Sequence, residues 1–229
     1  MRHHADRVRA LRFKTRYGRV GTNCEMTATM NFTAKDVQDL RQRTGAGMMD
    51  AKKALVETGG DMAKAADLLR AKGIAKAEKR AGREASEGII GHYNHHNGSL
   101  AVLVELNCET DFVARTDDFK TLAKQLAEHV AGSPTVPLAV DRDGVPADVV
   151  AHERQVFEAQ VRESGKPEHL VGKIVEGKVE AFYRDVTLMS QPWIREPKKS
   201  IGELVKEASA KLGENVTVRR FVRFKLGGE

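Results

Sequence analysis

The sequence is poor in cysteine, in aromatic residues and in long apolar runs. Only Cys24 and Cys108 occur in 229 residues, too few for a disulfide framework, which suits a reducing cytoplasm. No apolar run approaches the ~18 residues that a membrane helix needs, so we expect a soluble protein with no membrane partner. Because 41% of the residues are hydrophobic, the chain can still bury a core in one or two domains.

Most of the net positive charge lies in the first thirty residues. They carry seven Arg and Lys side chains against two acidic ones, which accounts for most of the formal charge of +6. Without hydrophobic periodicity, residues 1–30 are predicted to be a disordered basic extension. It is either a targeting peptide or the product of a start codon placed too far upstream, with Met26 or Met30 as the true first residue. The nearly neutral remainder argues against direct nucleic-acid binding.

The clearest strand and one of the clearest helices meet at residues 107–115. Apolar residues alternate from Leu100 to Leu106, as in a strand with one buried face, and a helical stripe begins at Phe119. Between them, Thr110 and Asp111 can cap the following turn. Phe112 comes next, and composition alone favours a buried local plug over an exposed wedge at this position.

Residues 31–73 predict a small domain of three short helices. Thr33 with Asp36 forms a capping-box pattern, Met48 begins an apolar stripe, Asp61 caps the third helix, and Gly73 is expected to end it. Residues 74–86 are rich in charge and predict a solvated linker helix to the next domain.

Residues 87–229 predict an α+β core. Two strands flank Asn97-Gly98, a pair that favours a tight type I′ turn, and residues 146–189 predict a helical hairpin. A helix capped by Ser200 with Glu203 follows. The last strand is expected to join this sheet and to place its alternating apolar residues on one face. It is also expected to be an edge strand, to which a strand of a second copy could pair. Those apolar residues are Val216, Val218, Val222 and Phe224.

The sequence contains no pattern typical of an active site. We find no Ser/His/Asp constellation, no paired carboxylates with an evident pocket and no nucleotide loop, so we expect no catalytic residue and no cofactor. His92, His95 and His96 suggest a metal-dependent enzyme, but strand alternation separates neighbours and no Cys or carboxylate completes a ligand set, so no metal site is predicted. A binding protein remains the natural class.

Three long strings carry a family resemblance: TGAGMMDAKKAL at 44–55, NCETDFVAR at 107–115 and KIVEGK at 173–178. They resemble the bacterial elongation factor Ts family, the nucleotide exchange factors of elongation factor Tu, and the likeness runs from about Phe32 to Leu226. It implies a UBA-like N-terminal module, a cytoplasmic role in translation elongation, and a short form that lacks the second core repeat and the C-terminal module.

The resemblance also implies how the exchange factor would work. Thr110, Asp111, Phe112 and Val113 would disturb the magnesium and phosphate side of elongation factor Tu. A second set would grip the partner. It comprises Met48, Met49, Lys52, Ile194 and Arg195, the last of which replaces an apolar residue seen in some relatives. Trp193, beside this set, is expected to pack against the helical hairpin.

The implied partner is elongation factor Tu in its GDP-bound and nucleotide-free states, and a homodimer would give a 2:2 complex. The alternative is an RNA-binding translation or ribosome-associated adaptor that uses the basic residues of the last strand. Those residues are Arg219, Arg220, Arg223 and Lys225.

Overall fold

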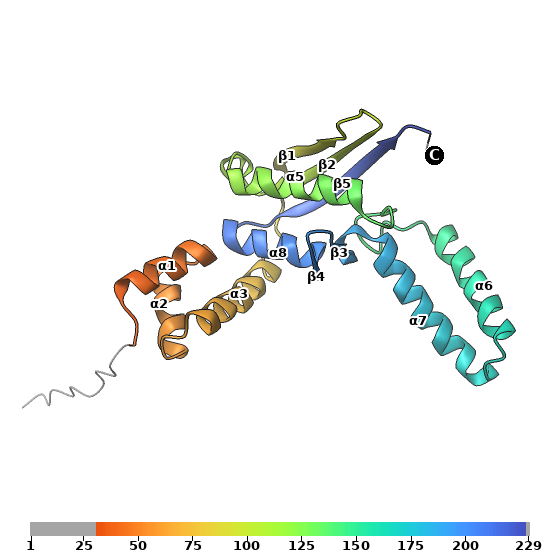
Figure 1. Ribbon diagram of the computed structural model, residues 1–229, viewed down its shortest axis with the longest axis horizontal. Coiled ribbons are helices and arrows are strands. Elements are labelled where there is room, and N and C mark those ends of the chain that lie inside the picture. Colours follow the sequence, from red (N-terminus) through yellow and green to blue (C-terminus); the bar gives the residue numbers. More distant parts are fainter. Residues whose placement is uncertain (1–30, 228–229) are drawn as a thin grey trace, which may run out of the picture.

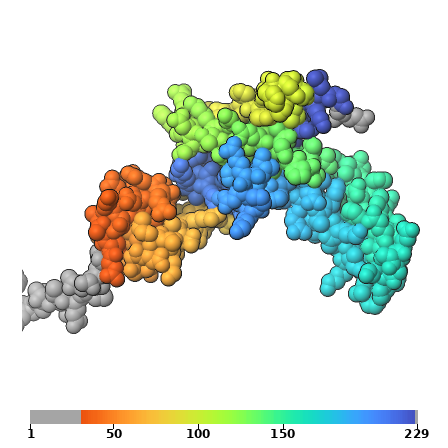
Figure 2. All heavy atoms as spheres, in the orientation of Figure 1, coloured from red at the N-terminus to blue at the C-terminus, as the bar shows by residue number. Residues whose placement is uncertain are grey.

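The computed structural model describes residues 31–227 and has the predicted α+β architecture (Figure 1). A three-stranded antiparallel sheet and its helices form the centre, and an N-terminal helical module and a helical hairpin project from it on opposite sides, which leaves a concave lower face in Figure 2. The predictions for residues 1–30 fall outside the described residues.

The N-terminal module consists of α1 (Ala34–Thr44), α2 (Met48–Glu57) and α3 (Met62–Glu78). Both predicted N-caps are present: Thr33 and Asp36 form a capping box, and the Asp61 side chain accepts bonds from two backbone N–H groups of α3. Apolar side chains of the three helices share a core of their own, centred on the fully buried Leu40 and Leu55. This cluster holds the first turn of α2 in place.

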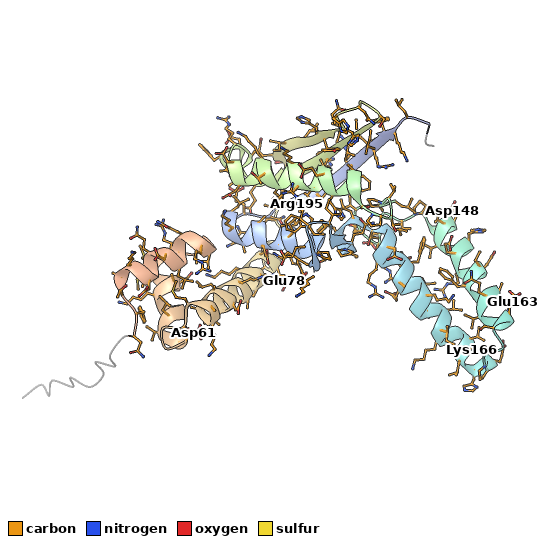
Figure 3. The ribbon with its side chains drawn as sticks, in the orientation of Figure 1. Asp61, Glu78, Asp148, Glu163, Lys166 and Arg195 are labelled. Atoms are coloured by element: carbon orange, nitrogen blue, oxygen red, sulfur yellow. The ribbon has the colours of Figure 1, made fainter. Side chains whose placement is uncertain are left out.

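The third helix does not end at Gly73, as the sequence predicted, but continues to Glu78. Gly73 lies where α8 (Ile201–Leu212) crosses α3, and a Cβ on this glycine would lie only 3.0 Å from the Ala210 Cβ. The glycine therefore permits close helix packing rather than a helix stop. The expected solvated linker is in part a packed element, because Ala77 is buried and Glu78 binds Lys206 of α8 (Figure 3).

The sheet has the order β1-β2-β5, and all its neighbours are antiparallel. β1 (Glu87–Asn94) and β2 (Leu100–Cys108) form the predicted hairpin, but its turn differs from the prediction. The Gly98 N–H donates to the His95 carbonyl, which puts His96 and Asn97 rather than Asn97-Gly98 at the centre of the turn. Gly98 follows with φ +69°, a conformation that glycine adopts freely.

The last strand, β5 (Thr217–Lys225), lies at the sheet edge beside β2 as predicted, but its apolar face is not the one that the sequence indicated. The register shifts between Glu105 and Leu106 of β2, so that Leu106 pairs with Val218 while Val104 pairs with Phe221. This β-bulge reverses the alternation. Phe221 packs on the core, whereas Val222 and Phe224 point outward and are exposed.

The main core lies between the sheet and two helices. α4 (Asp111–Ala114) is a single turn after β2, and α5 (Asp117–Gly132) then crosses the sheet, where a Cβ on Gly91 would come within 2.6 Å of the Ala123 carbonyl oxygen. α8 packs beside α5 and is capped by Ser200 with Glu203, as predicted. α5 is therefore packed between the sheet and α8.

The helical hairpin is formed by α6 (Ala147–Glu163) and α7 (Glu168–Val186), and Figure 3 places Glu163 and Lys166 at its tip. Its seam joins Val161 of α6 to Val171, Val175 and Val179 of α7, and Leu170, which also fits an apolar spacing in α7, is exposed. The short helix η1 (Leu188–Ser190) and the strands β3 (Pro192–Trp193) and β4 (Glu196–Ser200) lead into α8. Trp193 packs against the main core rather than the helical hairpin, which corrects the prediction.

Candidate partner-binding site

The junction between β2 and α5 presents Phe112 to solvent. The ring is 78% exposed, whereas its neighbour Ala114 is buried and Val113 packs on the main core. Because one turn of helix spans only four residues, anchoring the inner side of α4 directs the next side chain away from the protein. Phe112 is thus not the buried plug that composition favoured, and its exposure is compatible with a wedge.

The Thr110 end of this turn is held by Glu214, which precedes β5. One Glu214 oxygen accepts from the Glu109 and Thr110 backbone N–H groups at 3.1 and 3.0 Å, and the other accepts from the Thr110 hydroxyl at 2.6 Å. The same hydroxyl oxygen accepts from the Val113 N–H and so caps α4, as predicted. Three bonds to one carboxylate fix the backbone just before Phe112.

A second carboxylate, that of Glu109, ties the junction to the connector after α3. It accepts from the Asn215 N–H at 2.7 Å and forms an ion pair with Arg83 at 3.4 Å. The backbone bond from Asn215 and the positive charge of Arg83 lower the pKa of Glu109 below its usual value, so the ionised carboxylate persists to lower pH. The Asn215 amide donates in turn to the Arg83 carbonyl at 2.7 Å. The junction is therefore clamped from two distant segments.

Asp111 lies beside the exposed ring and forms an ion pair with Arg115 one turn later, at 2.7 Å. Both side chains are largely in water, where such a pair contributes little to stability. The Asp111 carboxylate is therefore available to a partner at small energetic cost.

Three of the predicted grip residues lie near the start of α2. Met48 and Met49 are both exposed, Met49 at 64%, and Lys52 is exposed one turn further on. Ala51 and Leu55, which continue the apolar stripe that begins at Met48, are completely buried, so α2 is anchored just beyond its exposed first turn. Neither methionine is a core residue, so the flexible thioethers form an adaptable apolar surface.

Ile194 and Arg195 form the two-residue turn between β3 and β4, where Trp193 pairs with Glu196. Ile194 is partly exposed and lies near Gly132, the last residue of α5. Arg195 forms an ion pair with Glu128 of α5 and lies below that helix in Figure 3. The turn is thus attached to the C-terminal end of α5.

The Phe112 turn, the grip residues of α2 and the Ile194–Arg195 turn do not form one pocket. Phe112 lies just before α5 and Ile194 lies at its far end, and a 16-residue helix spans roughly 24 Å. A cavity of about 610 Å³ lies between the N-terminal module and α8, and none of these nine described residues lines it. Contacts spread over such a distance suit a large partner rather than a small ligand.

The structure gives the rival sites little support. Within residues 31–227, no three His, Cys, Asp or Glu side chains gather in a way that could hold a metal ion. His95 bonds the Tyr93 hydroxyl instead, at 3.0 Å. None of the helices in the described part of the chain is long and apolar enough to cross a membrane.

Sequence reasoning missed Glu214 and Asn215, which hold the junction. They follow the left-handed Gly213 at the end of α8 in a short turn without periodicity. Their partners lie about a hundred residues earlier in the chain. No local pattern could indicate these contacts, because they arise only when β5 pairs with β2.

An exposed aromatic ring on a clamped turn, together with two exposed apolar groups on separate elements, is the arrangement expected of a protein that contacts another macromolecule over an extended surface. A family model described as "Elongation factor TS" matches residues 27–228. The chain is 51% identical to elongation factor Ts of Fervidobacterium nodosum over 198 residues, which is 86% of this chain and all of that protein. It is 53% identical over 195 residues to elongation factor Ts of Anaeromyxobacter dehalogenans, covering 85% of this chain and 88% of that protein.

The chain belongs to the elongation factor Ts family. This membership confirms the resemblance and supports the predicted function, guanine nucleotide exchange on elongation factor Tu, over the RNA-binding alternative.

Proposed function

We propose that this chain binds the GDP-bound form of elongation factor Tu and promotes GDP release by inserting Phe112 near the magnesium and phosphates. The single observation that carries this proposal is the exposed Phe112 ring on a turn whose backbone is fixed by Glu214. Ordering an exposed aromatic side chain in advance lowers the entropic cost of inserting it into a partner.

The mechanism requires no covalent step, and no residue of this chain acts as an enzyme's catalytic group. Mg²⁺ demands nearly ideal octahedral geometry and bridges phosphate oxygens, so a ring that displaces its surroundings weakens both the metal and the nucleotide. Asp111, next to Phe112, would contribute its carboxylate to the same disturbance. Thr110 and Val113 would hold the turn in register.

Thermodynamic linkage closes the cycle. If the chain weakens nucleotide binding by some factor, the nucleotide weakens binding of the chain by the same factor. The nucleotide-free complex is therefore the tightest, and GTP in excess expels the chain.

The second set of residues would grip the partner while Phe112 acts. Met48, Met49 and Lys52 present an apolar surface with one positive charge, and Ile194 with Arg195 presents another at the far end of α5. These contacts would contribute to affinity for all nucleotide states, whereas the ring would discriminate among them.

A test follows the release of fluorescent GDP from elongation factor Tu after mixing with this chain and excess unlabelled GDP. We expect the release rate to rise with chain concentration and to saturate, and magnesium in excess to slow it. A release rate that is unchanged by the chain would overturn the proposal. Conversion of the nucleotide during the assay would contradict a purely non-covalent role.

The RNA-binding alternative is weakened by the surroundings of its candidate arginines. Arg219 and Arg220 both form ion pairs with Glu105 of β2, and Arg223 is half-buried on the inner face of the sheet. Glu105 therefore makes this a surface of mixed charge rather than an uninterrupted basic stripe for phosphates. We therefore propose a cytoplasmic translation factor that makes no direct contact with nucleic acid.

We also propose a homodimer, and hence a 2:2 complex, formed through the outer face of the sheet. Ile90, Leu103, Val222 and Phe224 expose apolar side chains there, with at least one on each of the three strands. A second copy that packs against this face would bury these apolar side chains, and the edge strand β5 keeps backbone groups open for pairing at the rim of the same contact.

Light scattering after gel filtration tests this arrangement. We expect a mass near twice 25.3 kDa for the wild-type chain and a monomer for Phe224→Ser. Leu138→Ser, which changes an exposed leucine in the loop after α5, should remain dimeric. A wild-type mass of one chain at the concentrations used for exchange would refute the dimer.

A further inference from the structure

His129 is a buried histidine that links α5 to the turn carrying Ile194. It lies one turn before the end of α5 and is only 1% exposed. Its Nε2 lies 3.0 Å from the Gln191 Oε1, and its Nδ1 accepts a long hydrogen bond, 3.4 Å, from the Ile194 backbone N–H. The imidazole therefore touches the backbone of a proposed grip residue.

The hydrogen-bond network determines which nitrogen carries the proton. The Gln191 amide nitrogen donates to the Thr135 and Asp185 carbonyls, at 2.9 and 2.5 Å, so the Gln191 oxygen must face the histidine. Nε2 is then the donor, and Nδ1 is left as a bare acceptor for the Ile194 N–H. Burial lowers the pKa of His129, which favours this neutral form.

Gln191 in turn fixes the network to three other segments. Its side chain is bound to the carbonyls at the end of α7 and in the loop after α5, and its own carbonyl accepts from the Ile201 N–H at 3.0 Å. The imidazole is thus held rigidly from one side and offers its acceptor on the other. The turn is also tied to α5 by the ion pair between Arg195 and Glu128, which lies nearer the surface, where ion pairs contribute little.

We propose that His129 is a positioning residue: its neutral Nδ1 holds the Ile194 N–H and so presents the Ile194–Arg195 turn to elongation factor Tu. This inference rests on the proposed role of Ile194 in gripping the partner. A buried acceptor suits the task because it orders the turn before binding, so that the complex loses less conformational entropy on forming.

Two substitutions of His129 distinguish the role of the Nδ1 acceptor from that of the Nε2 donor. In His129→Asn the Oδ1 can occupy roughly the place of Nδ1 and accept from Ile194, while the bond to Gln191 is lost. In His129→Gln the longer amide can reach Gln191 and leaves the Ile194 N–H without a partner. Each variant loses one of two hydrogen bonds and some packing, so their thermal midpoints should fall by similar amounts.

Binding to nucleotide-free elongation factor Tu should distinguish the two variants. We expect His129→Asn to bind within about threefold of wild type and His129→Gln to bind about tenfold more weakly, as one lost hydrogen bond predicts. In an Ile194→Ala background, His129→Gln should cause little further loss, because the residue acts through Ile194. Equal losses in the two variants, or full additivity with Ile194→Ala, would show that His129 serves stability alone.

The Ile194 amide gives a readout that does not depend on the partner. In the free protein its proton chemical shift should change strongly in His129→Gln and little in His129→Asn. If wild-type chain fails to bind elongation factor Tu while this pattern holds, the proposed function fails and the positioning contact stands. If the pattern is absent, the inference fails whatever the binding result.

Discussion

Replacing Phe112 with alanine should nearly abolish the stimulation of GDP release while leaving the protein folded. A phenylalanine side chain offers about 150–250 Å², and Phe112 is 78% exposed, so insertion into a partner buries on the order of 150 Å². At about 25 cal/mol per Å², and allowing for the methyl group that alanine keeps, the loss is roughly 3 kcal/mol. That energy corresponds to about a 100-fold slower release at saturating chain.

Stopped-flow release of fluorescent GDP measures this effect, and titration of the partner measures docking separately. Affinity for the GDP-bound form should change less than tenfold, since the proposed grip residues are left intact. The free energy of unfolding should change by no more than about 0.5 kcal/mol, because the ring makes few contacts in the free chain. Leu138→Ala, another exposed apolar residue, should match wild type in all three measurements. Wild-type release at saturating Phe112→Ala would refute the wedge.

Three further changes test the supports of the site. Glu214→Ala removes the acceptor for three bonds to Glu109 and Thr110 and should cost about 2 kcal/mol in urea unfolding; it should also slow exchange with Phe112 intact, and unchanged exchange would contradict the clamp. Glu109 has a pKa below its usual 4.5, so its ionised form stabilises the fold above that pH and loses this contribution as the pH falls through the lowered value. The thermal midpoint of Glu109→Gln should lie below that of wild type at neutral pH, and this difference should shrink below about pH 4.5. A difference that stays constant with pH would show that the charge of Glu109 does not stabilise the fold. Val175→Ala, in the helical hairpin seam, should destabilise that hairpin by roughly 2 kcal/mol in hydrogen exchange and leave GDP release unchanged; slower release would place the hairpin in the exchange surface.

The predicted elements followed from local signals, and the errors arose where distant segments meet. Capping patterns and periodicity located the helices because those signals act within a few residues. The sidedness of β5 was wrong beyond Val218 because the bulge depends on pairing with β2, a hundred residues earlier. The prediction that Gly73 ends a helix was wrong for a related reason. This glycine makes room for Ala210 of α8, a contact that the sequence does not reveal.

The sequence predicted which residues form the candidate site, but not the contacts that hold them in place. The family strings indicated Phe112 and Met49, and the structure shows both side chains exposed. Their assignment to partner contacts stays a prediction. The clamp through Glu214 and the imidazole of His129 could not be foreseen, because each connects segments that only the folded chain brings together.

The unbroken α3 affects how the two ends of the molecule can act together. A flexible tether would let the N-terminal module search a volume, and its contribution would be limited by the effective concentration that such a tether allows. Here α3 packs closely on α8, with Gly73 against Ala210 and with Ala77 buried, so the module is carried at a set distance from the core. If the proposed contacts hold, engagement of one surface would deliver the other in register, and the chain would behave as a bivalent ligand with a stiff spacer rather than as two independent binders.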